Sequence, residues 1–282
     1  MSLMVNAIRI GMTRGWTMFR HLMTTADGLG NTVFWNGVPL GYLVLNRNTE
    51  IEGVPFSLAT LALPGLIGLA ITASAYGPAY YIAAEREDGT LLRTKAAPYG
   101  IVAYVTGVLV MATLETMVSV LVLLVPGIIL FDGLVLPDAI GWLTLVAVTV
   151  LALMATLPVG VVIGSVVKSP RLIGGVGLLV IGGMTILSGI FIPLQAFPGW
   201  LQVVAQAFPP YWAAMGMRSV FLPDAVVAGE IGQSWRTLEM FGVLGAWAIV
   251  GALVAPVVLR RMARRATGSS VEANRQQALQ RM

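Results

Sequence analysis

The stretch Ile101–Leu130 reads IVAYVTGVLVMATLETMVSVLVLLVPGIIL, and Glu115 is the only charged side chain in it. A helix needs about 20 predominantly apolar residues to cross a bilayer, so this run is long enough to span one. Further charge-poor runs lie on both sides of it along the chain. The predicted spans are Leu29–Leu45, Pro55–Ile82, Ile101–Leu130, Ile140–Val167, Leu172–Ile192 and Leu238–Leu259.

The composition of the whole chain indicates the same class of protein. Of its 282 residues, 57% are hydrophobic and 11% are charged, whereas a soluble domain carries about 25% charged residues. We therefore expect an all-α polytopic membrane protein with six transmembrane helices. The expected domains are an interfacial amphipathic helix (1–27), the transmembrane domain (28–260) and a cytoplasmic basic tail (261–282). In the first of these, Met4, Ile8, Met12 and Trp16 recur at helical spacing, which is typical of a helix lying in the membrane interface.

The basic residues predict the orientation. Fourteen of the 17 Lys and Arg residues fall on the side that holds both termini and the loops after the second and fourth predicted spans. By the positive-inside rule, that side and both termini are cytoplasmic. The net charge of +4 is thus interpreted as a topogenic signal, and no nucleic-acid partner is predicted.

Several chemistries are excluded by residues that the chain lacks. It has no Cys and one His, so a thiolate or histidine-cluster metal site is not expected. Its lysines, Lys95 and Lys168, do not follow glycine, so no nucleotide-binding P-loop exists. We predict no catalytic residue, no metal and no cofactor in this chain.

The predicted cytoplasmic loop 84–98 reads AEREDGTLLRTKAAP. Gly89 permits a turn, and Thr90 can cap a short helix that begins at Leu91. We expect Leu91 and Leu92 to face the cytosol, where exposed leucines in a charged loop indicate a docking surface. The alternative is a solvated turn that carries topogenic charges.

A second motif follows the fifth predicted span. It comprises SGIFIPL (188–194), FPGWL (197–201) and FPPYWA (208–213). Its prolines divide it into pieces that are too short to span a bilayer but too apolar for a free loop. We expect short re-entrant helices on the extracellular side before the last span. The alternative is an ordinary amphipathic linker.

Together the two motifs resemble those of type-2 ABC transporter permeases, with daunorubicin-resistance-type export permeases as the nearest subgroup. The resemblance implies that E-R-E-x-G-T-L forms a coupling helix that contacts an ATPase subunit. The implied coupling residues are Glu85, Arg86, Glu87, Gly89, Thr90, Leu91 and Leu92. The implied outer-gate residues are Pro193, Pro198, Gly199, Trp200, Phe208 and Pro209. The pair Pro209-Pro210 departs from the family pattern, which more often has one proline.

The same resemblance implies a function. It describes a transport subunit, not itself an enzyme, that exports an amphipathic or hydrophobic substrate such as a drug, antibiotic or lipid-like molecule, as in multidrug resistance. ATP and Mg would be bound by a cytosolic ABC ATPase present in two copies. A second copy of the chain, or a related permease, would complete a dimer in contact with lipids of the bacterial inner (plasma) membrane.

Polar and aromatic side chains within the predicted spans are candidates for the substrate path, although ordinary packing also explains them. These are Asn31, Trp35, Asn36, Tyr42, Tyr76, Tyr80, Glu115, Thr185 and Ser188. Glu115 lies deep in a span, where an ionisable group is costly and marks a functional hypothesis. Two other classes therefore stay open, an ion-coupled secondary transporter and an intramembrane lipid-modifying enzyme.

Overall fold

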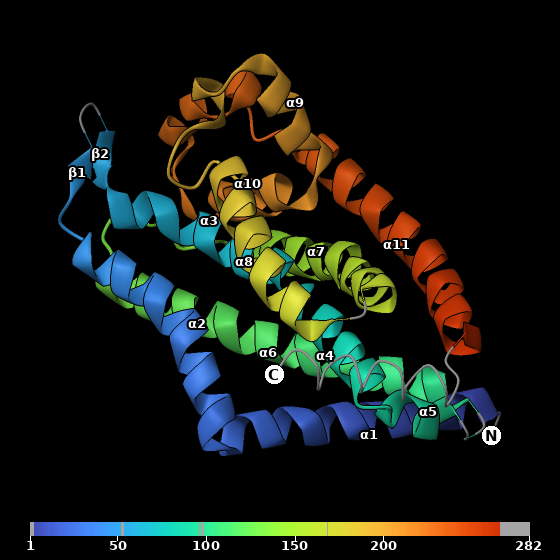
Figure 1. The fold of residues 1–282 in the computed structure, drawn as a ribbon. Helices are drawn as coiled ribbons and strands as arrows, with labels where there is room; N and C mark the ends of the chain where they lie inside the picture. Colours follow the sequence, from blue (N-terminus) through green and yellow to red (C-terminus); the bar gives the residue numbers. More distant parts are fainter. Residues whose placement is uncertain (1–2, 52–53, 96, 98, 168, 266–282) are drawn as a thin grey trace.

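The long helices of the chain run side by side, and α1 lies across one end of them (Figure 1). The computed structural model describes residues 3–51, 54–95, 97, 99–167 and 169–265. In chain order the helices are α1 (Leu3–Thr24), α2 (Ala26–Leu45), α3 (Leu58–Ala73), α4 (Tyr76–Glu87), α5 (Thr90–Lys95), α6 (Gly100–Leu130), α7 (Ala139–Val166), α8 (Pro170–Leu187), α9 (Gly199–Ala207), α10 (Pro209–Phe221) and α11 (Thr237–Arg265). Short 3-10 turns, η1 (Leu194–Ala196), η2 (Asp224–Gly229) and η3 (Ile231–Gln233), link the last of them.

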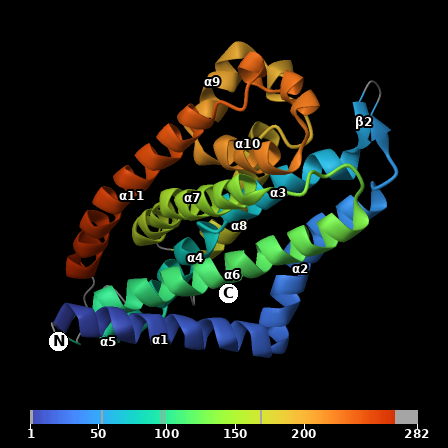
Figure 2. The same ribbon diagram turned by 180° about the vertical axis from the view of Figure 1, so that it is seen from behind.

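The two ends of the bundle differ in what covers them. The end that carries α1 and α5 is here called the α5 end, and the end that carries α9 and a small hairpin is the α9 end (Figures 1 and 2). The hairpin consists of β1 (Glu50–Ile51) and β2 (Val54–Ser57), which pair antiparallel. This hairpin corrects the predicted start of the second span at Pro55. The span begins at Leu58 instead, because the Ser57 hydroxyl accepts a hydrogen bond from the Thr60 amide and caps α3.

Within the described residues, five helical segments are long and apolar enough to cross a membrane. They are Leu58–Glu87 (α3 with α4), Gly100–Leu130, Ala139–Val166, Pro170–Leu187 and Thr237–Met262. The first predicted span, Leu29–Leu45, is α2, a helix of 20 residues that runs from α1 to the hairpin (Figure 1). It is not among the five, because Asp27, Asn31, Asn36 and several glycines dilute its apolar residues.

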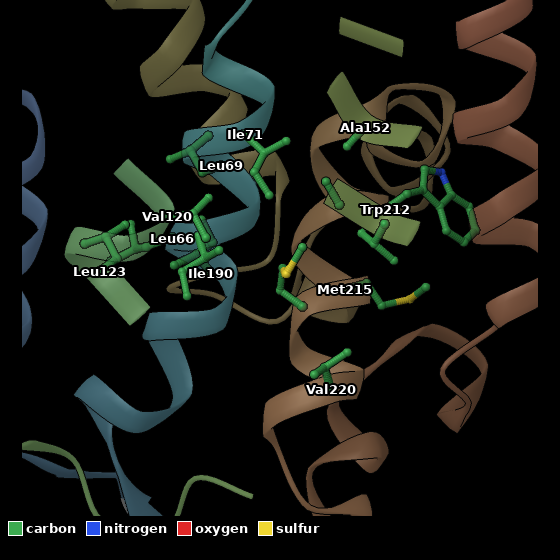
Figure 3. Close-up of a cluster of buried hydrophobic side chains, with 14 of the residues drawn as sticks. Leu66, Leu69, Ile71, Val120, Leu123, Ala152, Ile190, Trp212, Met215 and Val220 are labelled. Atoms are coloured by element: carbon green, nitrogen blue, oxygen red, sulfur yellow. The ribbon is translucent and has the colours of Figure 1, made fainter. Parts of the chain in front are cut away.

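The core lies around α10, whose residues are almost all buried. Figure 3 shows its Trp212, Met215 and Val220 near Leu66, Leu69 and Ile71 of α3 and near side chains of other helices, all of one hydrophobic cluster. The backbones of α3 and α10 approach closely where Gly68 faces Ala214. A Cβ atom at position 68 would lie 2.5 Å from the Ala214 Cα atom. Only glycine allows this approach, which seats α10 inside the bundle.

Helix α1 is attached to α6 through small residues. Ala7, Gly11 and Gly15 are its buried positions, and a Cβ atom at either glycine would lie 2.6 Å from a carbonyl oxygen of α6. The predicted apolar face, which includes Met12 and Trp16, stays exposed, as a helix in the membrane interface requires. The spacing of the apolar residues does not reveal the face that packs on α6, because that face consists of Ala7, Gly11 and Gly15.

At the other end of the chain, α11 continues to Arg265, beyond the predicted domain boundary at residue 260. Arg260, Arg261 and Arg264 therefore extend a helix, because nothing in their sequence stops it. The remainder of the predicted basic tail (266–282) lies outside the described residues.

Candidate functional site

Glu85 and Arg14 join α4 to α1 at the α5 end. An Nη2 atom of Arg14 donates to both carboxylate oxygens of Glu85, at 3.1 and 3.3 Å. The Arg14 guanidinium also lies over the ring of Tyr104, 4.8 Å from its centroid. Tyr104 belongs to α6 and is fully buried. One partly buried cation thus holds three helices together through a charge pair and a cation–π contact.

Arg86, the next residue, joins α4 to α7. Its Nη1 atom donates to the carbonyl oxygens of Ser165, Gly164 and Val167, at 2.7, 3.2 and 3.3 Å. These carbonyls are at the C-terminus of α7, where the helix dipole is negative and intrahelical donors run out. Close contact of the two helices is possible because Gly160 and Gly164 of α7 face Ala75 and Ala79, as expected for a GxxxG pair.

The turn between α4 and α5 forms at Gly89, whose φ of +82° is favourable only for glycine. The cap of α5 differs from the prediction. Thr90 is the first residue of α5, and its amide donates to Asp88 Oδ1 at 2.8 Å. Asp88 therefore caps this helix, because its side chain reaches over the Gly89 turn. Glu87, also assigned to coupling, ends α4 and is half-buried.

The predicted exposure of Leu91 is wrong. Its side chain is 2% exposed and belongs to a cluster with Ile82, Tyr104, Val161 and Leu259, so it faces the bundle. The inward face of a single-turn helix cannot be read from two adjacent leucines, because they point in different directions. The side chain of Leu92 lies outside the described residues. Tyr99, which sequence reasoning missed, is instead 50% exposed and has a φ of 54°.

The structure does not gather the substrate-path candidates at one place. Asn31 and Trp35 are exposed on α2, whereas Asn36 is buried and donates to the Thr32 carbonyl. Tyr42 lies against Phe191, with ring centroids 5.2 Å apart, and Tyr76 stacks on Tyr80 at 6.0 Å.

The remaining three candidates lie on α6 and at the end of α8. Thr185 donates to the Ile181 carbonyl. Ser188 is fully buried. Glu115 is half-buried on α6, within electrostatic range of Tyr81. Of the nine candidates, Tyr76 alone is among the described residues that line a cavity of about 590 Å³ beside α8.

The outer-gate candidates begin the short helices that the prolines predict. Pro193 precedes η1, Pro198 and Gly199 begin α9, and Pro209 begins α10. Trp200 is 69% exposed on α9. Phe208 packs on Trp247 of α11, with ring centroids 5.7 Å apart.

A buried charge pair that the sequence does not predict lies under these short helices. Arg218 Nε donates to Glu230 Oε1 at 2.5 Å, and the two side chains are 6% and 8% exposed. Arg218 Nη1 also donates to the Ser188 carbonyl at 3.2 Å, and the Tyr211 hydroxyl donates to Glu230 Oε2 at 3.2 Å. One feature of the sequence could have indicated this pair, because Arg218 is the one charged residue in the apolar run 209–222.

This network connects the residue after α8, the first and last turns of α10 and the turns before α11. Gln195 of η1 donates to the Glu230 carbonyl, so the outer-gate segment is also connected to the network. Because buried charges are tolerated only when paired and hydrogen-bonded, the network holds these elements in one arrangement.

The two ends of the bundle therefore carry different structural features. The α5 end has a short helix whose Leu91 belongs to a buried cluster with residues of α4, α6, α7 and α11, and the α9 end has short helices held by a buried charge pair. No match to a curated protein was found. The profile of the ABC-2 type transporter family matches residues 4–222, which include α5 and α10. The chain thus belongs to the ABC-2 type transporter family and is a membrane permease component of an ABC exporter.

Proposed function

We propose that this permease moves an amphipathic or hydrophobic compound outward, using ATP that two copies of a separate ABC ATPase hydrolyse, and that two permease chains form the complex. The observation that carries the proposal is the placement of α5. Its backbone turn is exposed at the end of the bundle, while its Leu91 side chain is inserted among α4, α6, α7 and α11.

Movement of α5 would disturb a buried cluster to which α4, α6, α7 and α11 contribute. Leu91 contacts a cluster that includes Ile82, Tyr104, Val161 and Leu259, so displacing α5 displaces their packing or leaves a cavity, both of which are costly in a close-packed interior. The Glu85–Arg14 pair extends the connection to α1. Docking of an ATPase on α5 would be transmitted to the bundle in this way.

The docking contact itself would be made by residues other than Leu91. Thr90, Ala97 and Tyr99 are exposed around α5. A bulky residue with positive φ is strained and persists where the surrounding structure imposes it, often at functional sites. Tyrosine is also enriched among residues that dominate protein interfaces. Tyr99 is therefore our candidate for the main ATPase anchor.

The charges support a cytoplasmic location for this surface. Arg9, Arg20 and Arg86 are on helices of the α5 end, and Arg260 and Arg264 are on the last turns of α11, which end near α5 (Figure 1). The positive-inside rule places such a cluster in the cytosol, where the ATPase is found.

The test uses charged substitutions at the exposed positions. Tyr99→Glu and Thr90→Arg should lower the affinity for the co-purifying ATPase by about 30-fold or more, the loss typical of a central interface residue. Ala225→Arg is the control, because Ala225 is exposed on η2 at the α9 end. The readouts are the amount of co-purified ATPase and substrate-stimulated ATP hydrolysis at matched expression.

Retention of the ATPase by both α5 variants would refute the docking assignment. Transport by the purified permease alone, driven by an ion gradient, would favour a secondary transporter over the proposed function.

A further inference from the structure

A cavity of about 590 Å³ separates α8 from α7. Its volume is within the roughly 300–1,000 Å³ of pockets that bind drug-sized ligands. The break between α3 and α4 contributes Thr72 and Tyr76 to its wall, and the junction of α9 and α10 contributes Phe208 and Tyr211. Ile173 is the one buried residue of α8, so this helix forms a thin outer wall.

The wall of the cavity provides almost no charged or free hydrogen-bonding group for a polar ligand. None of the described lining residues is charged. Thr72 and Thr156 donate to carbonyls of their own helices, and Tyr211 donates to Glu230. The indole nitrogen of Trp247 donates to the Ala207 carbonyl. Among the lining side chains, the Tyr76 hydroxyl is the one polar group for which the described residues provide no hydrogen bond.

The cavity is also long. Lining residues on α8 extend from Leu172 to Leu187, a helical rise of about 22 Å out of the roughly 30 Å thickness of a bilayer's hydrocarbon core. On the facing side they extend from Thr156 of α7 to Val167, the residue that follows this helix.

We propose that this cavity binds a hydrocarbon chain, either of a lipid or of a lipid-like or lipidated solute, lying along α8. A polar or charged ligand would lose hydrogen bonds to water that this wall does not replace, which is costly. A hydrocarbon chain loses none, and its length uses the full extent of the cavity. The residues of one subunit line this site, and of the substrate-path candidates that the sequence predicts it includes Tyr76.

The neighbouring glycines Gly182 and Gly183 provide a matched pair of variants. Gly183 lines the cavity and Gly182 does not, and a Cβ atom at either position would have no atom within 4 Å. Gly183→Phe therefore places a ring in the cavity without a backbone clash, whereas Gly182→Phe places it outside. Val159→Phe fills the same cavity from α7, and it serves as a second variant if Gly183→Phe folds poorly.

The probe is hexadecanol that carries a diazirine on its chain, photolysed with the purified permease in nanodiscs, with the labelled peptides identified by mass spectrometry. We expect labelling on the facing sides of α7 and α8. Gly183→Phe and Val159→Phe should lower it by about tenfold, the effect of losing the contacts of two buried methylene groups. Gly182→Phe should leave it unchanged.

Equal labelling in all variants would overturn the proposal. So would a change in the number of permease copies caused by Gly183→Phe, because the cavity would then be an interface between copies. Nanodiscs made with a diazirine-bearing phospholipid distinguish the sources. Cavity labelling from that phospholipid identifies a bilayer lipid, and labelling from hexadecanol alone identifies a solute.

The idea that the bound hydrocarbon chain is part of the exported substrate rests on the proposed function. The binding of a hydrocarbon chain in the cavity does not rest on it, because labelling is measured without ATP and without the ATPase. If the unsubstituted permease docks the ATPase but is not labelled on the facing sides of α7 and α8, the cavity proposal alone is contradicted. If it is labelled there but Tyr99→Glu and Thr90→Arg retain the ATPase, the α5 docking proposal alone is contradicted.

Discussion

Substituting only one residue of the buried pair Arg218–Glu230 should destabilise the protein more than substituting both. Arg218→Leu leaves the Glu230 carboxylate, 8% exposed, without its cation, and Glu230→Leu leaves the guanidinium without its anion. Removing one partner of a buried pair costs about 3–5 kcal/mol. Replacing both by apolar residues is often close to neutral, because no charge is then desolvated. The double variant should therefore be more stable than either single variant.

The measurement is a double-mutant cycle on reversible unfolding in mixed micelles, followed by the fluorescence of the 7 Trp residues. We expect a coupling free energy of at least about 3 kcal/mol between positions 218 and 230, at the upper limit of pairs in contact. A matched control is available in Glu239, which is 50% exposed and pairs with Arg236 at 3.5 Å. Glu239→Gln should cost less than about 1 kcal/mol, and Glu230→Gln clearly more.

Two results together would refute the coupling of Arg218 and Glu230. One is that the losses in free energy of unfolding caused by Arg218→Leu and by Glu230→Leu simply add in the double variant. The other is an equal loss of stability for the two Glu→Gln variants, which would mean that the pair at 218 and 230 is solvated like a surface pair.

Three further predictions concern the α5 end and the orientation. Gly15→Leu should detach α1 from α6, because a Cβ atom at this position would lie 2.6 Å from the Gly107 carbonyl oxygen. The expected loss of stability is about 1–3 kcal/mol, and hydrogen exchange of the α1 amides should become faster. The control Gly30→Leu should leave this exchange unchanged, because a Cβ atom at position 30 meets open space. Leu91→Ala should cost about 2–5 kcal/mol in thermal unfolding and Leu91→Met less than about 1.5, whereas equal losses would contradict the burial of Leu91. In this chain without Cys, Thr90→Cys should resist an impermeant thiol reagent in intact cells and Asp224→Cys should react; the opposite pattern would reverse the orientation.

The sequence by itself determined the five helical segments that are long and apolar enough to cross a membrane. The predicted span Ile101–Leu130 is α6 (Gly100–Leu130) to within one residue, because in lipid every backbone group must be bonded within its own segment. Local chemistry likewise determined α5, which begins after the turn at Gly89, and the short helices that start at Gly199 and Pro209. The start of α3 was missed, because apolar residues of a hairpin strand look like the beginning of a span.

Only the tertiary structure decided which faces meet. A soluble helix reveals its buried face by the contrast between apolar and polar residues, but a membrane helix is apolar on the lipid side and on the protein side. The inward position of Leu91, the packing of Gly11 and Gly15 on α6, and the cavity along α8 were therefore invisible in the pattern. The pairing of Arg218 with Glu230 across 12 residues depends on how α10 enters the bundle. In the sequence these two residues are isolated charges, and the burial that makes them partners arises from packing between helices.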